Sequence, residues 1–566
     1  MKFVFLSYLF FNFLLIISCS YSQFSLPNHL SVLLKQSPIT HRNGIGILVE
    51  AGSSHEPRNV QGLAHLLEHM LFMASNKYPK EGYFKELLGN SHGYSNAMTN
   101  DIFTVYFFDI DSHSANFELI ADVFSRFFID PILQEETLSR EINAVNNEYE
   151  NDLNSNEWRF QELMRTLANP KSPFNHFCIG NRDTLKINSE KGRLKDIIKE
   201  FYDKFYVSSK MHLFINSNLP MNKMKKMASN IFGKIPYKPP FKLPNHLKEK
   251  KLAYPNSILG SLAWYKPIGN LKMISVLFPF ENLQLLKLGR ENHYFYFIEK
   301  IIKDKSENSI YTQLKKEELI VSLDIGRFDR YYQLRVMSVR FLLTAKGVGN
   351  VEKILQIFFD GLKKLKKQAI KKSYFKKIGI RNFVSFLFKD KMPFHEETIQ
   401  TLFELRDGQK FEKNEILRRE IFVNFDEKVI SRIFDRLIPE KSIIVFASED
   451  YSEKSGRFKA FHRIKYWSAG ETAIINDFKF EQQFIDSSLK RFKVESEVEN
   501  DRRILRFYVK GVTKSSIMSE KSLDKFENIM KINYAFEKMS PSVTIYNIFW
   551  KMFLTSFWKE LKRAQT

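Results

Sequence analysis

Cysteine is scarce in this chain, with only Cys19 and Cys178 among its 566 residues. Removal of an N-terminal signal segment that contains Cys19 would leave Cys178 alone, so no internal disulfide is expected. A chain of this length buries enough apolar surface to fold without covalent cross-links. Acceptor sites of the form N-x-Ser/Thr are missing as well, so N-glycosylation is not expected. These absences predict a large globular protein held together by its packed cores.

Acidic residues are too few to balance the basic ones: 64 Asp and Glu stand against 86 Lys and Arg, for a net charge of +22. Such a balance favours acidic peptides, anionic surfaces or polyanions as partners. Nucleic acid is not expected, because no zinc-knuckle, helix-turn-helix or aromatic RNA-binding pattern accompanies the charge. The lysine run at residues 363–367 lies above an apolar stripe with helical spacing, which is typical of an ordinary solvated helix face.

Long apolar runs are rare, and the one that stands out is at the N-terminus. Residues 3–17 are nearly all apolar, and small or polar residues follow up to Gln23. This core is shorter than the roughly 20 residues that a membrane span needs, so residues 1–22 are predicted to be a signal peptide cleaved between Ser18 and Gln23. We therefore expect a secreted or secretory-lumen protein without membrane association after cleavage. A lipid-attachment site at Cys19, in a bacterial host, and a retained anchor are the alternatives.

The stretch HLLEH at residues 65–69 is the most informative feature that is present. Residues four apart share one helix face, so His65 and His69 can reach a single metal ion with the Glu68 carboxylate beside it. This H-x-x-E-H order is the inverted form of a common zinc-hydrolase signature. Residues 63–73 are apolar enough for a buried helix, in which unsatisfied imidazoles would be costly. A metal ion is the favoured partner, and hydrogen bonds to backbone groups are the alternative.

A catalytic zinc site usually has three protein ligands and one open position, so a third ligand must come from elsewhere. Residues 135–169 show a helical pattern with few breakers, and within it Glu141 and Glu148 are seven residues apart on one face. Val145 lies on the same face, so we expect both carboxylates to be embedded among apolar side chains. The spacing alone does not choose between Glu141 and Glu148.

The chain resembles the insulysin/pitrilysin (insulinase-like) family of zinc endopeptidases, and within it the insulysin branch. The resemblance covers most of residues 30–450 and is strongest at HLLEHM (65–70), KYPKE (77–81), SNAMT (95–99), YFFD (106–109) and REINAV (140–145). It implies that Glu148 is the third zinc ligand and that Glu141 orients the site. It also implies that Glu68 is the general base that activates a zinc-bound water, with one zinc ion per chain.

The same resemblance implies where a peptide substrate lies. Residues 94–99 match an edge strand to which substrate adds as a further strand, with Asn96 and Ala97 as the contact positions. An Asn-containing turn before the strand at 103–109 is the alternative. Residues 325–327 match, more loosely, a second strand that anchors the N-terminus of the substrate.

The expected fold is α+β, with two homologous insulinase-type domains, each a mixed sheet packed against helices, and the start of a third. We assign residues 24–240 to the zinc-binding domain, 256–493 to a metal-free copy without H-x-x-E-H, and 504–566 to a partial third domain. A proline-rich connection around residues 236–255 separates the first two. An amphipathic tail helix on a partner or membrane is the alternative for the last segment.

The function expected from these features is that of a secreted zinc metalloendopeptidase for short, flexible peptides. Full-length members of the family have four such domains in two halves, and an Arg and a Tyr of the second half assist transition-state binding. This chain stops early in what would be the third domain, so either the sequence is a fragment of a longer protein or a C-terminal-half subunit or a homo-oligomer completes it. The alternatives are the catalytic half of a two-subunit processing peptidase and a non-catalytic peptide-binding protein.

Overall fold

The computed structural model describes residues 19–448 apart from 170, 190–192, 240–251, 255, 257, 266, 282, 292, 332–333, 388–391, 409–410, 412–421 and 423, and then four strands at 457–459, 464–469, 493–499 and 502–508. Residues 1–18 of the predicted signal peptide and residues 509–566 of the predicted third domain lie outside this range. No helix within it has the length and hydropathy needed to cross a bilayer.

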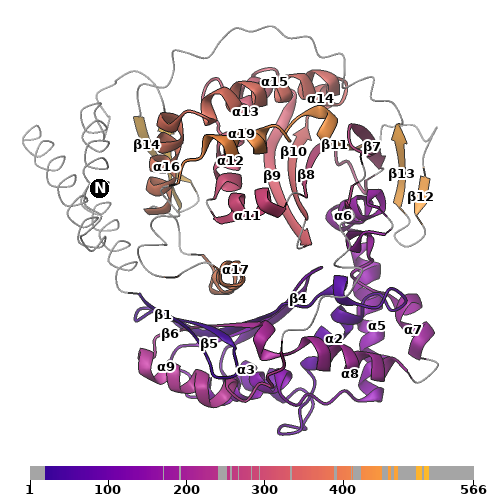
Figure 1. Ribbon diagram of the computed structural model, residues 1–566, viewed down its shortest axis with the longest axis vertical. Coiled ribbons are helices and arrows are strands. Elements are labelled where there is room, and N and C mark those ends of the chain that lie inside the picture. The colour runs from indigo at the N-terminus through magenta and orange to yellow at the C-terminus, as the bar shows by residue number, and fades with distance from the viewer. Residues whose placement is uncertain are drawn as a thin grey trace, which may run out of the picture.

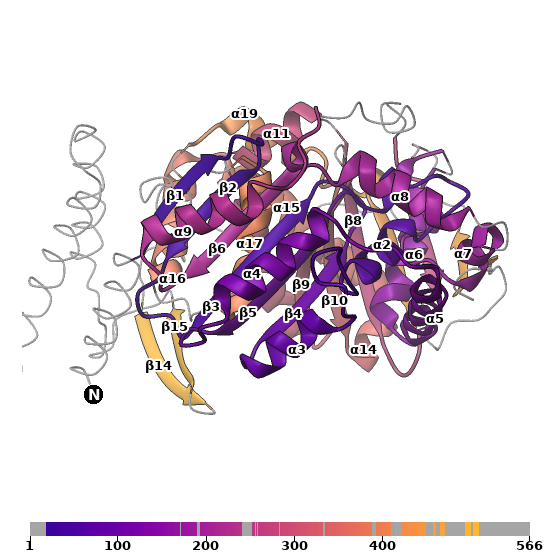
Figure 2. The same ribbon diagram turned by 90° about the horizontal axis from the view of Figure 1, so that it is seen from below.

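The first domain is a six-stranded sheet covered on one face by helices (Figures 1 and 2). Its strands are β1 (Ser20–Ser25), β2 (Ser31–Gln36), β3 (Arg42–Val49), β4 (Tyr94–Thr99), β5 (Thr104–Asp111) and β6 (Met211–Ser217). They run in the order β1-β2-β6-β3-β5-β4, and all pairs are antiparallel except β2 with β6. β4 is therefore an edge strand among the described strands, as the family resemblance implies for residues 94–99.

The helices of the first domain are α2 (Leu63–Leu71), α3 (Tyr83–Asn90), α4 (Phe117–Ser125), α5 (Glu135–Asp152), α6 (Asn156–Leu167), α7 (Arg182–Ser189), α8 (Leu194–Phe205) and α9 (Met221–Met227). Figure 2 shows α3, α4 and α9 lying across the strands, with α5 and α7 together at one end. Ile45, Ile47 and Val49 of β3 pack with Leu63 and Leu67 of α2 in one buried core. Burial of this apolar face fixes α2, the predicted metal helix, against the sheet.

One predicted helix is in fact two. The helical pattern at residues 135–169 breaks after α5, and α6 begins anew at Asn156. The Ser155 side chain accepts a hydrogen bond from the backbone N–H of Trp158, so it caps α6 rather than continuing α5. A serine that bonds the next turn competes with an uninterrupted helix. Both predicted glutamates stay together on α5.

The second domain repeats the plan of a sheet covered by helices. Its sheet has the order β12-β13-β7-β11-β8-β10-β9, with β7 and β11 parallel. The strands are β7 (Ser261–Tyr265), β8 (Met273–Phe280), β9 (Ile320–Tyr331), β10 (Leu334–Leu343), β11 (Ile443–Ala447), β12 (Arg457–Lys459) and β13 (Ile464–Ala469). The covering helices are α11 (Leu283–Glu291), α12 (Tyr294–Ile302), α13 (Ile310–Lys316), α14 (Ala345–Val348), α15 (Val351–Ala369), α16 (Lys372–Leu387) and α19 (Glu427–Phe434). A separate hairpin joins β14 (Lys493–Glu499) and β15 (Arg502–Tyr508).

Helix α17 (Phe394–Arg406) ties the two domains together. It lies within the second domain in the sequence, between α16 and α19, yet it packs on β3, β5 and β6, over the face of the first sheet that is turned away from α2 (Figure 1). Gly44 and Gly46 make room for it, because a Cβ on Gly46 would lie 2.6 Å from Thr398 Cγ2. A shared core beside α17 contains residues of both sheets, among them Leu48 and Leu277. The α+β, two-domain expectation is confirmed.

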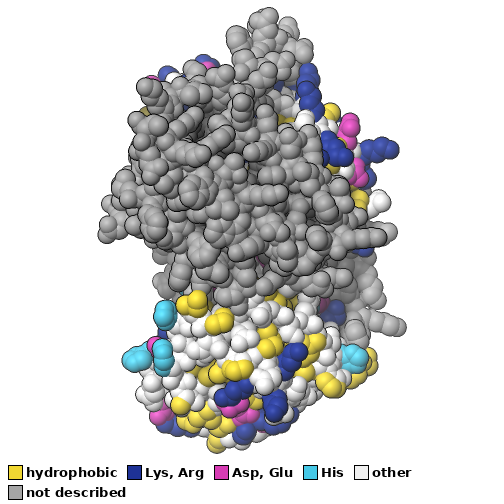
Figure 3. All heavy atoms as spheres, turned by 90° about the vertical axis from the view of Figure 1, so that its left-hand side faces the viewer, with side chains coloured by type: hydrophobic (Ala, Val, Ile, Leu, Met, Phe, Trp, Pro, Cys, Tyr) yellow, Lys and Arg dark blue, Asp and Glu magenta, His cyan; other side chains and the backbone are white. Residues whose placement is uncertain are grey.

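On the described first-domain part of the face that Figure 3 shows, Lys and Arg side chains lie beside acidic and hydrophobic ones. On α15, Leu355, Phe358 and Leu362 are buried whereas Lys363 and Lys367 are exposed. The lysine run therefore is a solvated helix face, as its spacing predicts.

Candidate metal centre

Helix α2 presents His65 and His69 one turn apart. Gly62 stands at its N-cap in the left-handed region with φ 93°, and the buried residues Leu66 and Leu67 hold its other side against the core. The two imidazoles meet nearly at right angles, with an Nε2 to Nε2 distance of 3.3 Å. The helix thus directs one nitrogen of each ring toward a common point.

Helix α5 brings Glu148 to that point. Its Oε2 lies 3.2 Å from His65 Nε2 and 3.6 Å from His69 Nε2. Three ligand atoms at zinc bond lengths of about 2.0–2.1 Å and tetrahedral angles would be roughly 3.3 Å apart, which matches all three separations. Among the described residues, His65, His69 and Glu148 form the group that could hold a metal ion. The donor set therefore fits zinc.

Both imidazoles are held at their far nitrogens. The carbonyl oxygen of Ile179 lies 2.8 Å from His65 Nδ1, and the Glu141 carboxylate lies 3.3 Å from His69 Nδ1. A carbonyl can only accept, so His65 Nδ1 must carry the proton and its Nε2 is left free to bind a cation. Such outer partners fix the tautomer and the plane of a metal-binding ring.

Glu68 sits beside this group without belonging to it. Its side chain is buried, and the Thr99 hydroxyl donates a hydrogen bond of 2.6 Å to its Oε2. Thr99 is the last residue of β4, so the hydrogen bond joins the metal helix to the edge strand. A carboxylate next to a cation and next to an open strand edge is placed to handle protons of a bound substrate.

The carboxylates shift the pKa values of the site. Burial alone would lower the pKa of His69, but hydrogen bonds to Glu141 and Glu148 outweigh it and raise the pKa to about 10. Hydrogen bonds from His65 and His69 hold the pKa of Glu148 well below its usual range. Burial raises the pKa of Glu68, against the opposing charge of His65 and the Thr99 hydrogen bond. Three carboxylates around two imidazoles make a site that favours a cation.

The predicted substrate positions lie on the exposed edge of β4, in a strand and not in a turn. Asn96 and Ala97 are opposite Phe107 and Tyr106 of β5, and the described strands place no partner on the other side of β4. The amide of Ala97 donates to Asn96 Oδ1 at 2.9 Å. An amide bonded to an exposed side chain can exchange that bond for the carbonyl of an added strand.

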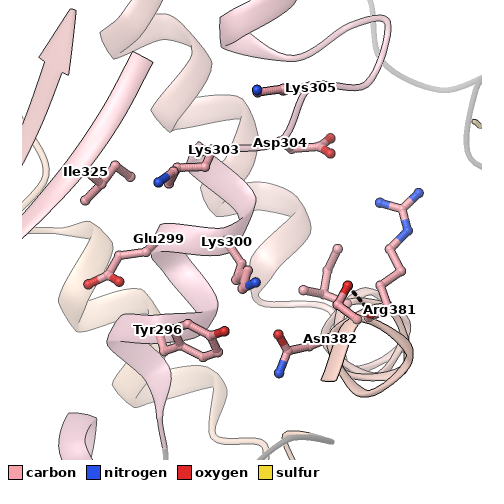
Figure 4. Close-up of a pocket in the computed structure, with 11 residues that line it drawn as sticks. Tyr296, Glu299, Lys300, Lys303, Asp304, Lys305, Ile325, Arg381 and Asn382 are labelled. Atoms are coloured by element: carbon pink, nitrogen blue, oxygen red, sulfur yellow. Dashed lines mark hydrogen bonds between the residues drawn. The ribbon is translucent and has the colours of Figure 1, made fainter. Parts of the chain in front are cut away.

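The more loosely predicted anchor, residues 325–327, lies on β9 at the edge of the second sheet. Ile325 lines a cavity of about 450 Å³ between α12, α16 and β9 (Figure 4). Lys and Arg side chains lie there beside Glu299 and Asp304, and Lys303 pairs with Asp324 at 2.5 Å. Charges of both signs line this cavity. Within the described residues, the group that could hold a metal ion is His65, His69 and Glu148, and none of these lines the cavity.

The predicted burial of Glu148 was wrong. Both Glu141 and Glu148 were expected among apolar side chains, but only Glu141 is buried, and the Glu148 side chain is 51% exposed. Glu148 reaches the histidines from the open side of the site. The roles of Thr99 and of the Ile179 carbonyl were not predicted, because a tertiary hydrogen bond leaves no pattern in the local sequence.

Family models match much of the chain. Residues 31–171 match the model described as Insulinase (Peptidase family M16), and residues 194–378 match the model described as Peptidase M16 inactive domain. A candidate zinc protease of Schizosaccharomyces pombe, mug138, is 29% identical over 483 residues, which are 84% of this chain and 48% of that protein. Insulin-degrading enzyme of Drosophila melanogaster is 29% identical over 461 residues, with shares of 81% and 45%. The chain thus spans about half the length of the curated relatives it matches.

Solved structures show the same fold. Pitrilysin superposes with a TM-score of 0.72 at 21% identity, over 91% of this chain and 56% of pitrilysin. Likeness at that identity concerns the fold. It extends over both sheets and the helices that cover them.

Proposed function

The chain belongs to the insulinase (peptidase M16) family, and on that premise we propose that it is a zinc metalloendopeptidase that cleaves short, flexible peptides. The observation that carries the proposal is the gathering of His65, His69 and Glu148 within 4.8 Å of one another, with Glu68 beside them. Membership of the family does not by itself mean that the zinc ligands are present. Their arrangement in this chain supports an active site rather than one that has lost its function.

His65, His69 and Glu148 would hold one zinc ion per chain. Two imidazoles and a carboxylate are a donor set of catalytic zinc sites, and softer or all-oxygen sets suit other ions better. When bound, zinc polarises the scissile carbonyl and lowers the pKa of water toward neutrality. Glu141 and the Ile179 carbonyl keep the two rings turned toward the ion, because each holds an Nδ1.

Glu68 is the group that moves the proton. Its carboxylate accepts a proton from the attacking water and returns it to the nitrogen of the departing amine. Burial raises the pKa of Glu68 toward the range in which a carboxylate can both accept and return a proton. Thr99 holds one of its oxygens, so the other is free to face the substrate.

The edge of β4 would bind the peptide. An extended peptide that adds to β4 exchanges main-chain hydrogen bonds with Ala97, and this requires little sequence but an unfolded segment. Asn96 releases the Ala97 amide when its side chain turns away. Residues 325–327 of β9 serve, in this proposal, as a second and remote anchor for the N-terminus of the substrate.

We propose that activity depends on a second polypeptide. Since the chain spans about half the length of its relatives, a C-terminal-half subunit or a second copy of the chain would complete the enzyme. The catalytic half of a two-subunit processing peptidase is the second candidate, favoured by the same coverage, and a non-catalytic peptide-binding protein is the third. We further propose secretion after signal cleavage; cleavage close to Ser18 would keep β1, which begins at Ser20.

The test is a fluorogenic-peptide assay on the full chain, alone and with a co-purified homologous partner that lacks H-x-x-E-H. The proposal expects turnover that a chelator abolishes and that added zinc restores. Turnover only with the partner identifies the two-subunit peptidase. Peptide affinity without turnover under both conditions would instead identify a binding protein and refute the proposed activity.

A further inference from the structure

A buried carboxylate with no role in the proposed chemistry stands at the start of the metal helix. Glu56 follows the short turn Ser53–His55 and is 0% exposed. Its Oε2 accepts the backbone N–H of Gly62 and its Oε1 accepts that of Ala64, both at 2.8 Å. The first amides of a helix lack partners within the helix, and Gly62 has no side chain to cap them. Glu56 therefore supplies the missing cap with a charge that the helix N-terminus favours.

The same carboxylate also holds a second segment. His176 Nε2 lies 3.2 Å from Glu56 Oε2, and both side chains are buried. From the opposite side, Arg165 donates to the backbone carbonyl of His176 at 2.8 Å and pairs with the buried Asp101 at 2.8 Å. His176 is thus fixed between α6 and Glu56. A burial this complete is stable only because every charge has a partner.

The segment that His176 begins leads directly to the metal site. The N–H of Phe177 donates to the Gln61 side chain at 2.8 Å. Gly180 packs on Gly62 so closely that a Cβ on Gly62 would lie 2.3 Å from its Cα. Between them, the carbonyl of Ile179 orients His65 at 2.8 Å. One carboxylate therefore holds both the helix that carries His65 and the segment that carries the orienting carbonyl.

We propose that Glu56 is a positioning residue of the zinc site, which fixes α2 against residues 176–180 and thereby fixes the ring of His65. The inference rests on the proposed function, because it concerns the affinity of that same site for zinc. Glu56 does not touch the ligand atoms; it acts through Ala64, next to His65, and through His176, three residues before Ile179. Loss of its charge should loosen the ring and weaken zinc binding.

The chain offers a matched control. Glu50 is a second carboxylate of the first domain, less completely buried than Glu56, and it binds His212 Nε2 and Lys210 Nζ at 3.0 Å each. Its partners lie on β6 and in the turn before it, not on α2 or on residues 176–180. Glu50→Gln and Glu56→Gln therefore each break a carboxylate–histidine pair, but only the second breaks one that leads to His65.

The experiment is zinc affinity by chelator competition on the full chain, with circular dichroism melting of the zinc-free protein in parallel. Glu56→Gln should bind zinc about tenfold more weakly than the unchanged chain, the smaller end of what outer partners of metal ligands contribute. Glu50→Gln should keep its zinc affinity although it melts at a lower temperature. A merely structural role of Glu56 would lower the melting temperature and leave the affinity unchanged.

Unchanged affinity in folded Glu56→Gln overturns the inference. If that variant fails to fold, His176→Leu takes its place, because it keeps both backbone hydrogen bonds of Glu56 and removes only the contact of Glu56 with residues 176–180. Weaker binding in His176→Leu supports the inference, and unchanged binding overturns it. Failure of the unchanged chain to bind zinc at all would instead refute the proposed function, so the two failures are distinguishable.

Discussion

Glu141 and Glu148 show at the residue scale what helical spacing can and cannot tell. Seven residues of helix separate them by about 10 Å along the axis, so they cannot contact the same atoms. In the structure, the Glu148 carboxylate lies beside Nε2 of both histidine rings, and the Glu141 carboxylate lies beside Nδ1 of His69. The spacing predicted both residues as candidates and left the choice open. Only the family resemblance assigned their roles, and these roles stay predictions.

Backbone partners lie beyond prediction at this scale. The HLLEH motif predicts one shared helix face, and the two rings indeed meet at 3.3 Å. The carbonyl of Ile179 that orients His65 belongs to a loop more than a hundred residues away. Any residue type could supply it. Glu56 left a weak signal, since an acidic residue shortly before a glycine-initiated helix is a plausible cap.

Glu68→Gln tests the proton-transfer role. The amide keeps the size of the side chain and can still bond Thr99, but it cannot accept a proton at neutral pH. Peptidase activity should fall at least about 100-fold, whereas bound zinc should stay at the level of the unchanged chain. Steady-state kinetics and elemental analysis of the same preparation check this. Full activity in the variant would contradict the assignment.

At the scale of elements, period and breakers predicted most of what builds the site. The buried helix from residue 63 is found where the apolar content predicts it, and the strand at 94–99 is found where the family resemblance implies it. The boundary between α5 and α6 was missed because the helical pattern of apolar residues runs on through Ser155, which acts as a cap only in the folded chain. The packing of α17 on the first sheet was missed as well, since it joins segments some 350 residues apart.

Gly46→Val tests the fit of α17 on β3. A Cβ at this position would lie 2.6 Å from Thr398 Cγ2 and 2.8 Å from Leu402 Cδ1, and valine adds two methyl groups to it. The free energy of unfolding should fall by about 1–3 kcal/mol, as overpacked cores do. Urea denaturation measures it.

Gly89→Ala is the control for that substitution. Gly89 lies in α3 with open space where its Cβ would be. Alanine there should leave stability unchanged or raise it by up to about 1 kcal/mol. An equal loss of unfolding free energy in Gly46→Val and Gly89→Ala would contradict the close packing of α17 on β3.

At the scale of the whole molecule, buried residues of both sheets share one core beside α17. The domain division predicted from the proline-rich connection stays a prediction, and this core joins residues on both sides of it. Composition could not reveal it. The chain spans about half the length of the curated relatives it matches, and we therefore propose that peptide turnover is the property a partner would affect most.

Stability in acid is a property of the whole molecule, and Glu50 with its partners His212 and Lys210 should influence it. Hydrogen bonds and charge from His212 and Lys210 outweigh burial and lower the pKa of Glu50 from its usual 4.5 to about 2. A carboxyl whose pKa is lowered by folding stabilises the protein above pH 4.5, and this contribution is lost as pH falls toward 2. Glu50→Gln should lower the free energy of unfolding by about 3 kcal/mol at pH 7.

The pH dependence distinguishes this explanation from a packing effect. The difference in unfolding free energy between the unchanged chain and Glu50→Gln should shrink steadily between pH 4.5 and pH 2. Denaturant titrations at several pH values measure it. A difference that stays constant over that interval would show that the ion pairs of Glu50 do not cause it.

The most direct test of the central claim is the zinc content of the dialysed chain with and without the Glu148 carboxylate. The unchanged chain should carry one zinc ion, and Glu148→Gln should lose it. Glu150→Gln, an exposed carboxylate two residues further along α5, should keep it. A Glu148→Gln chain that retains one zinc ion with undiminished affinity would contradict the account.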